Sequence, residues 1–295
     1  MKVTDFIGYA IETQTWEYTW KDVSLYALAC GAGKNELQYT YAYRDDFRTL
    51  PTFGLVPSFT SNFITPRTPF CKCPGGILQK TFNGSGLDWD DELELYRPID
   101  CIKGTLMWDY VLEDIWDRGP GKGIVLCNVM HIYDDVGRPV AKNTNRTVMF
   151  QEGGFGGKPV PQSEAVFPDR EPDFVADDYV DRSMHMIYNL ATNSISEFPI
   201  HIDEAFCKKE AHQPGVVVQG HLTLGLACRH AVRLAAGGND SSVTKIYAQF
   251  RNPLFPETAV QFRGWEVEKG KVYFKVIDKV TGKPYLNNGV FQYKA

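Results

Sequence analysis

The sequence predicts an α+β fold in which an antiparallel sheet wraps around a buried helix, with this unit made twice along the chain. Three observations carry the prediction: strand-like runs in both halves, one helical stretch that is apolar on most faces, and a short internal repeat. The chain has 295 residues, which is about two domains of roughly 150 residues each.

Strand-like runs occur in both halves. They are rich in β-branched and aromatic residues or alternate between polar and apolar side chains, which is typical of antiparallel strands. The runs are Gly104–Leu112, Gly123–Tyr133, Thr147–Gln151, Ser242–Phe250, Ala259–Glu268 and Lys271–Ile277. The acidic run Asp88–Glu94 lacks the glycine and the spacing of a calcium loop, so we expect a solvated strand edge there and no metal site.

A helical stretch and a short internal repeat indicate that the chain consists of two similar halves. The stretch Gly215–Ala227 is apolar on most helical faces, as a buried central helix requires. Tyr26-Ala27-Leu28-Ala29 is echoed by Tyr188-Asn189-Leu190-Ala191, and Thr52-Phe53-Gly54-Leu55 by Thr223-Leu224-Gly225-Leu226. The matches are short, so coincidence is the alternative to a true repeat. Because residues 153–173 are rich in Gly and Pro, we interpret them as a linker and expect halves of 1–160 and 161–295.

Composition excludes several classes of partner. The 31 Lys and Arg against 36 Asp and Glu give a net charge of −5, so we expect no nucleic-acid partner. No apolar run reaches the ~18 residues that a membrane helix needs. The seven cysteines are an odd number, and Cys71 and Cys73 have no second cluster of ligand spacing, which favours a reducing compartment without a structural zinc.

We expect no targeting signal and no cofactor. The first residues do not form an apolar leader, and the last three, Tyr293-Lys294-Ala295, do not make a Ser-Lys-Leu address. We therefore expect a cytoplasmic protein by default. Nothing in the sequence indicates a cofactor or a metal, and a small-molecule substrate is the expected partner.

One long segment carries a family resemblance. Tyr188-Asn189-Leu190-Ala191 leads to Pro199-Ile200-His201-Ile202-Asp203, and Gln219-Gly220-His221-Leu222 follows. This is similar to the hydratase 2 (MaoC-like) enzymes, whose signature is Tyr-x-Leu-x-Gly-Asp-x-Asn-Pro-Leu-His-x-Asp followed by a His-Gly-Leu turn into the central helix. Further landmarks stand in the family's order over nearly the whole chain; they include Asp22–Gly33, Leu50–Gly54, Glu94–Pro98, Gly153–Gly157 and Arg251–Pro256.

The resemblance implies a tandem double hot-dog, in which two antiparallel sheets each wrap around a long central helix. It also implies that the N-terminal half shapes an acyl pocket, while the C-terminal half carries an Asp/His pair. That pair adds water to a 2-enoyl thioester, or removes it from the product, with R stereochemistry. The substrate would be an acyl-CoA or a carrier-protein thioester. By the same resemblance a homodimer is a possible assembly, with a monomer as the alternative because two tandem hot dogs already supply the paired sheet; a peroxisomal location also becomes an alternative.

The family's site residues transfer only in part. His201 matches the catalytic histidine, and Gly220 matches the glycine whose N–H polarises the thioester carbonyl. The aspartate is missing: its slot falls on Asn193 when counted from Tyr188, and on Ser196 when counted back from His201. Neither side chain can act as a general base.

Other polar positions of the motif are changed as well. The asparagine before proline becomes Phe198, and the histidine before the glycine becomes Gln219, whereas a new imidazole stands at His221. Two carboxylates are candidates for the lost role. Glu197 lies in the enlarged loop, and the alternative to a catalytic role is that it is an exposed surface charge. Asp203 lies two residues after His201, and the alternative to a functional role is that it caps a helix.

These residues define the expected site. The catalytic candidates are His201, Gly220, Glu197, Asn193 and Ser196; the substrate-binding candidates are Asp203, Gln219, His221, Phe198 and Phe53. The leading hypothesis is a hydratase or dehydratase acting on an acyl thioester or a related β-hydroxy carbonyl compound. The alternatives are an isomerase or cyclase acting on a polyketide-like substrate, and a non-catalytic acyl-binding subunit.

Overall fold

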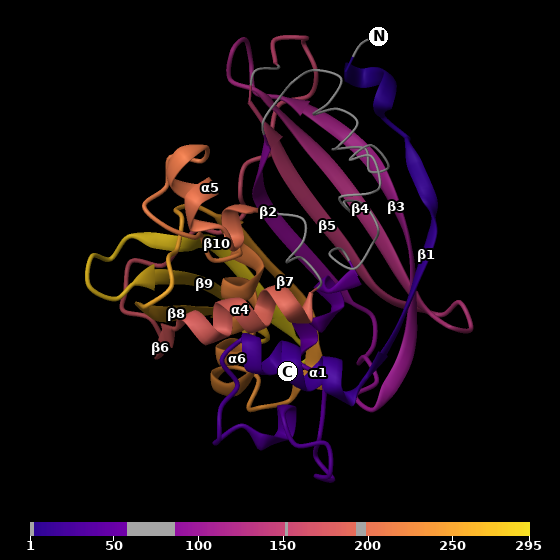
Figure 1. Cartoon of the computed structure of the whole chain (residues 1–295), viewed down its shortest axis with the longest axis vertical. Helices are drawn as coiled ribbons and strands as arrows, with labels where there is room; N and C mark the ends of the chain where they lie inside the picture. Colours follow the sequence, from indigo (N-terminus) through magenta and orange to yellow (C-terminus); the bar gives the residue numbers. More distant parts are fainter. Residues whose placement is uncertain (1–2, 58–85, 151–152, 193–198) are drawn as a thin grey trace.

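A computed structural model describes residues 3–57, 86–150, 153–192 and 199–295. Its ten strands form one antiparallel sheet in the order β1-β3-β4-β5-β2-β7-β10-β9-β8-β6 (Figure 1). The strands are β1 (Ala10–Thr19), β2 (Gly86–Leu95), β3 (Lys103–Asp117), β4 (Ile124–Asp134), β5 (Pro139–Met149), β6 (Phe174–Val180), β7 (Val243–Phe250), β8 (Thr258–Glu268), β9 (Lys271–Asp278) and β10 (Pro284–Tyr293).

The described helices are few. The α-helices are α1 (Trp20–Ala29), α4 (Arg182–Ala191), α5 (Glu204–Lys209) and α6 (Gly220–Leu234). The 3₁₀-helices are η1 (Val3–Phe6), η2 (Leu37–Tyr39), η3 (Pro51–Leu55), η5 (Pro199–His201) and η6 (Asp240–Ser242). No helix of the described residues is long and apolar enough to cross a membrane.

The expectation of two antiparallel sheets joined side by side is met only in part, because the strands of both halves form one continuous sheet. Strands β2 and β7 pair antiparallel, with Asp90 opposite Gln249 and Glu94 opposite Lys245. Each would otherwise be an edge strand with unpaired backbone N–H and C=O groups, and the pairing satisfies both rows. The sheet is therefore continuous across the junction of the two halves, which is visible at β2 and β7 in Figure 1.

The same pairing corrects the expectation for the acidic run Asp88–Glu94. It belongs to a strand that has a partner on both sides, β5 and β7, and so is no edge. Asp90 and Asp91 are only 3% and 1% exposed. Burying carboxylates is costly unless they are hydrogen-bonded or paired, so this strand brings polar chemistry into the interior.

The sheet repeats the internal order that the sequence echo indicates. The strands on either side of the β2/β7 junction run outward in matching order, with β1 and β6 at the two ends. The echoed helices α1 and α4 lie side by side (Figure 1), and the rings of Tyr26 and Tyr188 are 5.8 Å apart between centroids. The division near residue 160 stays a prediction.

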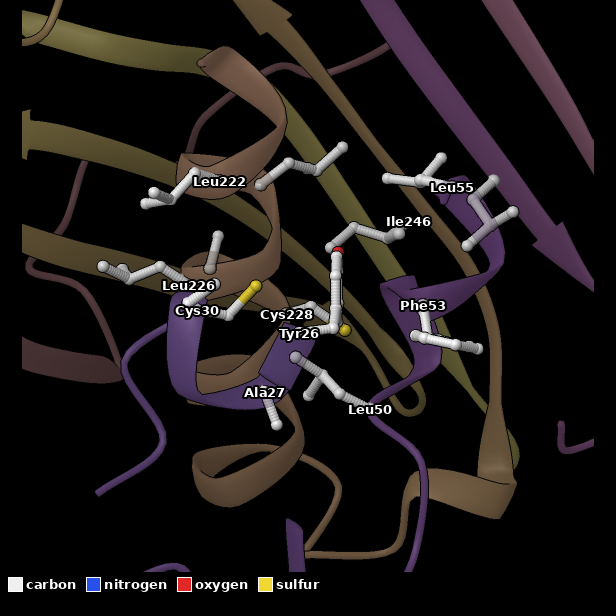
Figure 2. Packing of buried hydrophobic residues seen from close by; sticks show 14 of the residues in the cluster. Tyr26, Ala27, Cys30, Leu50, Phe53, Leu55, Leu222, Leu226, Cys228 and Ile246 are labelled. Carbon is white, nitrogen blue, oxygen red and sulfur yellow. The ribbon is translucent and has the colours of Figure 1, made fainter. Parts of the chain in front are cut away.

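The core is built around α6. Every residue from His221 to Val232 is buried, which agrees with a helix that is apolar on most faces. Figure 2 shows Leu222 and Leu226 of α6 packed near Cys30, the residue that follows α1, and Tyr26 of α1, with Phe53 and Leu55 of η3 in the same cluster. The second long central helix, expected around the echo Thr52–Leu55, is represented in the described ranges by the 3₁₀-helix η3; residues 58–85 lie outside those ranges.

The helix starts differ in how they are capped. The side chains of Thr19, Asp181 and Asp203 accept backbone N–H bonds at the starts of α1, α4 and α5. The residue before α6, Gln219, makes no such bond. The first amides of a helix have no partner within the helix; at the start of α6 the Leu222 amide donates to the carbonyl oxygen of Gln219, and the positive end of the helix dipole lies at Gly220.

Candidate active site

His201 ends η5 and is half-buried. Its Nδ1 lies 2.7 Å from the carbonyl oxygen of Val217. A carbonyl can only accept, so Nδ1 carries a proton and the lone pair of the neutral ring is on Nε2. The residue that holds the ring, Val217, belongs to the segment leading into α6.

The ring of His201 is neutral near pH 7. Its pKa is lowered to about 4, mainly by burial and also by the nearby His185 and His221, against the Val217 hydrogen bond and the charge of Asp88, which raise it. A neutral imidazole whose remaining lone pair is on Nε2 has the form that a general base requires.

Gly220 is the first residue of α6. Within the described ranges its N–H meets no acceptor. A Cβ at this position would lie 2.5 Å from the ring of Phe250, so the packing here requires glycine. The backbone amide can therefore donate to an oxygen brought to the start of the helix, where the helix dipole favours negative charge.

A buried amide network ties His201 to the start of α6. The Nε2 of Gln219 donates to Oδ1 of Asn189 at 2.9 Å. The Nδ2 of Asn189 donates in turn to the carbonyl oxygens of His185, at 3.0 Å, and of His201, at 3.3 Å. Gln219 thus fixes η5, α4 and the N-terminus of α6 relative to one another.

His221 is paired with a buried carboxylate. Its Nε2 lies 2.8 Å from Oδ2 of Asp91, and its Nδ1 lies 4.0 Å from Oδ2 of Asp88. Burial lowers the pKa of His221, but the hydrogen bond to Asp91 and the charges of Asp91 and Asp88 outweigh it, so the pKa is raised above its usual value. The site therefore holds two imidazoles with oppositely shifted pKa values.

The other candidates are placed as follows. Asp203 is exposed, and its Oδ1 accepts from the amides of Ala205 at 2.7 Å and Phe206 at 3.0 Å, as the cap of α5. Phe53 is fully buried and packs against Tyr26 (Figure 2). Four candidates lie outside the described residues: Asn193, Ser196, Glu197 and Phe198.

Sequence reasoning missed Asp91, Asn189 and His185. Asp91 is 130 positions from His221, and no local pattern links the two. The signal that was present, an acidic run in a strand, indicates a solvated edge until the β2/β7 pairing is known. Among the described residues, no group of three His, Cys, Asp or Glu side chains is arranged to hold a metal ion.

Two cavities are formed by described residues. One, of about 630 Å³, lies at the end of the N-terminal strands beside Arg48 and Arg97. The other, of about 480 Å³, is lined by Arg182, Glu204 and Val216 among others. Val216 immediately precedes Val217, the residue whose carbonyl holds His201. Neither lining includes His201 or Gly220.

Each half of the chain matches the model of a known protein family. The MFE-2 hydratase 2 N-terminal domain matches residues 16–153, and the MaoC like domain matches residues 164–288. The chain is 30% identical to the 3-hydroxyacyl-thioester dehydratase Y of Mycobacterium tuberculosis, over 98% of this chain and 97% of that protein. It is 25% identical to the probable enoyl-CoA hydratase 2 of Dictyostelium discoideum, over 98% and 95%.

Solved structures agree with this assignment. A MaoC-like dehydratase from Phytophthora capsici superimposes with a TM-score of 0.84 at 25% identity, covering 100% of this chain and 99% of that one. The full-length peroxisomal multifunctional enzyme type 2 of Drosophila melanogaster gives a TM-score of 0.79 at 22% identity, over 97% of this chain and 48% of that one. The sequence resemblance and the double hot-dog architecture are therefore confirmed.

Proposed function

Because the chain belongs to the MaoC-like dehydratase family and its N-terminal half is of the hydratase 2 type, we propose that it is a hydro-lyase. It adds water to a 2-enoyl thioester or removes water from a 3-hydroxyacyl thioester. The observation that carries the proposal is His201, a neutral imidazole with its lone pair on Nε2, held beside the uncapped start of α6.

The chemistry follows from these two groups. In dehydration, Nε2 of His201 removes a proton from the carbon next to the thioester carbonyl. The negative charge that develops on the carbonyl oxygen is stabilised by the N–H of Gly220 and the dipole of α6. The electron pair then forms the C=C bond as the C–O bond to the hydroxyl group breaks, and the departing oxygen takes up one proton from a general acid to leave as water.

Relatives favour this reaction over the alternatives. Those that match over nearly their whole length are named as a dehydratase of 3-hydroxyacyl thioesters and as an enoyl-CoA hydratase. We therefore propose a thioester substrate for this chain, with the acyl group attached either to CoA or to a carrier protein. The peroxisomal location is named for other relatives, including the enoyl-CoA hydratase 2 of Arabidopsis thaliana, and we propose the cytoplasm or the peroxisome here.

The proposal is tested by hydration of crotonyl-CoA, followed as loss of the enoyl absorbance. The wild-type chain is expected to hydrate crotonyl-CoA, and the kcat of His201→Gln is expected to be about 10²–10⁴-fold lower. The matched control is His131→Gln, on β4 and outside the site. Equal rates for wild type and His201→Gln would reject the assigned base, and absence of wild-type turnover on a series of chain lengths would reject the function.

The missing aspartate gives a second test. Asn193 and Ser196 occupy its slot when counted from the two ends of the motif. If the site descends from a hydratase, Asn193→Asp or Ser196→Asp is expected to raise crotonyl-CoA turnover. Glu197→Gln is expected to lower it if Glu197 has taken over the role. No change in all three variants would show that this loop supplies no acid or base.

A further inference from the structure

We propose that His221 is the acid that protonates the departing hydroxyl, and that Asp91 positions it. This assignment rests on the proposed function and names the group that replaces the family's missing aspartate. The two residues come from different halves of the chain, β2 and α6, and meet at the junction of the sheet.

The ring of His221 has two differently placed nitrogens. Nε2 faces Asp91, whose side chain is 1% exposed, at 2.8 Å. Nδ1 is directed toward Asp88, whose side chain is 46% exposed, at 4.0 Å. Because Asp91 accepts the Nε2 proton, the second proton of the charged ring is on Nδ1, the nitrogen on the side of the more accessible carboxylate.

Asp91 is built to hold that ring. Its carboxylate also accepts from the side-chain amides of Asn143 and Asn145 on β5, the latter at 3.2 Å. Three donors thus converge on one buried carboxylate, which fixes its orientation. A buried carboxylate with a single imidazole partner would be costly; the two asparagines reduce that cost.

Three observations place His221 in the same site as His201. It directly follows Gly220, the proposed donor to the thioester oxygen. Its ring lies 5.1 Å from that of Phe250, which also packs against Gly220. Its charge lowers the pKa of His201.

The two imidazoles have complementary protonation states. The pKa of His201 is lowered, so that ring is neutral, whereas the pKa of His221 is raised, so that ring holds its proton at higher pH. Titratable groups whose environments separate their pKa values are suited to act as a base and an acid in one reaction.

The step balances with these groups alone. Nε2 of His201 takes the proton from C2, the C2–H electron pair forms the C2=C3 bond, and the C3–O bond breaks. Nδ1 of His221 gives its proton to the departing oxygen, which leaves as water. His201 ends protonated and His221 neutral, and proton exchange with solvent restores both.

The test compares kcat for crotonyl-CoA hydration and 3-hydroxybutyryl-CoA dehydration in His221→Gln and in a matched control. Glutamine can still donate to Asp91 but cannot transfer a proton, so we expect a loss of about 10²–10⁴-fold in kcat. The control is His230→Gln, because His230 lies on the same helix, is 3% exposed and pairs with Asp178 at 2.9 Å. Its kcat is expected to equal that of wild type.

The pH dependence of the dehydration rate distinguishes a catalytic role of His221 from a purely structural one. Dehydration needs the protonated ring, so the rate falls as pH rises through the pKa of His221. Asp91→Asn removes the nearest charge, while Asp88, His201 and the apolar Phe250 remain around the ring. The alkaline limb is expected to move about 1–3 units toward lower pH. A role in folding alone would lower the amount of active protein without moving the limb.

The outcomes are distinguishable. An active wild type with an equally active His221→Gln variant overturns the acid assignment and leaves the proposed function standing. An unmoved alkaline limb in folded Asp91→Asn overturns the positioning role. If His221→Gln proves unstable, the double variant His221→Gln/Asp91→Asn buries two neutral amides, and wild-type activity in it contradicts the proposal. An inactive wild type overturns function and assignment together.

Discussion

His201 shows how a small number of contacts set the chemistry of one residue. The Val217 carbonyl selects the tautomer, and burial keeps the ring neutral. Asn189 holds the main chain of His201, while Gln219 ties Asn189 to the start of α6. Each contact acts on the position or the protonation of a single nitrogen, Nε2.

The lowered pKa of His201 predicts an acid limb at unusually low pH. An ordinary histidine becomes charged below about pH 6.5, whereas His201 keeps its lone pair until the pH falls through about 4. Among the described residues, His185, His221 and Asp88 are titratable groups whose charges act on its pKa. We expect kcat/KM for dehydration not to fall as the pH is lowered from about 7 to about 5, and a loss of rate on the acid side near pH 6.5 would contradict the neutral, buried ring.

At this scale the sequence predicts the residues of the motif and misses their partners. His201, Gly220 and Gln219 follow from spacing along one segment. Asp91 does not, because its relation to His221 exists only after β2 and β7 have paired. Asp203, weighed as a substrate contact or as a cap, is placed by the structure on the amides of α5, a role that its position before a short helix permits.

At the scale of elements, strands with strong local patterns were predicted and strands that depend on their neighbours were not. The runs in β3, β4, β7, β8 and β9 were found, and only the last residues of β5. The strands missed outright are β1, β6 and β10; in β10, Asn288 has a positive φ and the register shifts before Val290. Such a bulge contains residues typical of turns, so local propensity indicates no strand, while β7 and β9 on either side impose one.

Helix α6 depends on close contact with α1 at Gly225. A Cβ there would lie 2.3 Å from Sγ of Cys30 and 3.2 Å from the hydroxyl of Tyr26. Gly225→Ala gains helix propensity but forces the helices apart, and overpacking of this kind costs about 1–3 kcal/mol. We expect a lower free energy of unfolding in denaturant titrations. Gly33→Ala, where a Cβ meets nothing within 4 Å, is the control, and equal midpoints would contradict the close packing.

At the scale of the whole molecule, the two halves are joined by side chains as well as by the sheet. Arg229 of α6 donates to the carbonyl oxygen of Cys30 at 3.0 Å and pairs with Glu36, both in the N-terminal half. It also pairs with Asp178 of β6. Arg229, at 5% exposure, thus connects both halves through one buried guanidinium.

Removing this guanidinium is expected to destabilise the entire fold. Arg229→Leu leaves Asp178 and Glu36 without their buried partner, and breaking such pairs costs about 3–5 kcal/mol. Both halves are expected to unfold together, at a lower denaturant midpoint, by circular dichroism and by tryptophan fluorescence. Arg44→Ala, which breaks an exposed pair with Asp46, should leave the midpoint unchanged. A wild-type midpoint for Arg229→Leu would show that the network does not couple the halves.

The central claim is that a thioester binds with its carbonyl at the start of α6 and its reacting carbons beside His201. A crystal structure of the chain with 3-hydroxybutyryl-CoA tests it most directly. The account predicts the carbonyl oxygen about 2.7–3.1 Å from the Gly220 nitrogen, with C2 facing Nε2 of His201. A ligand seated instead in the cavity beside Arg48 and Arg97, away from both groups, would contradict it.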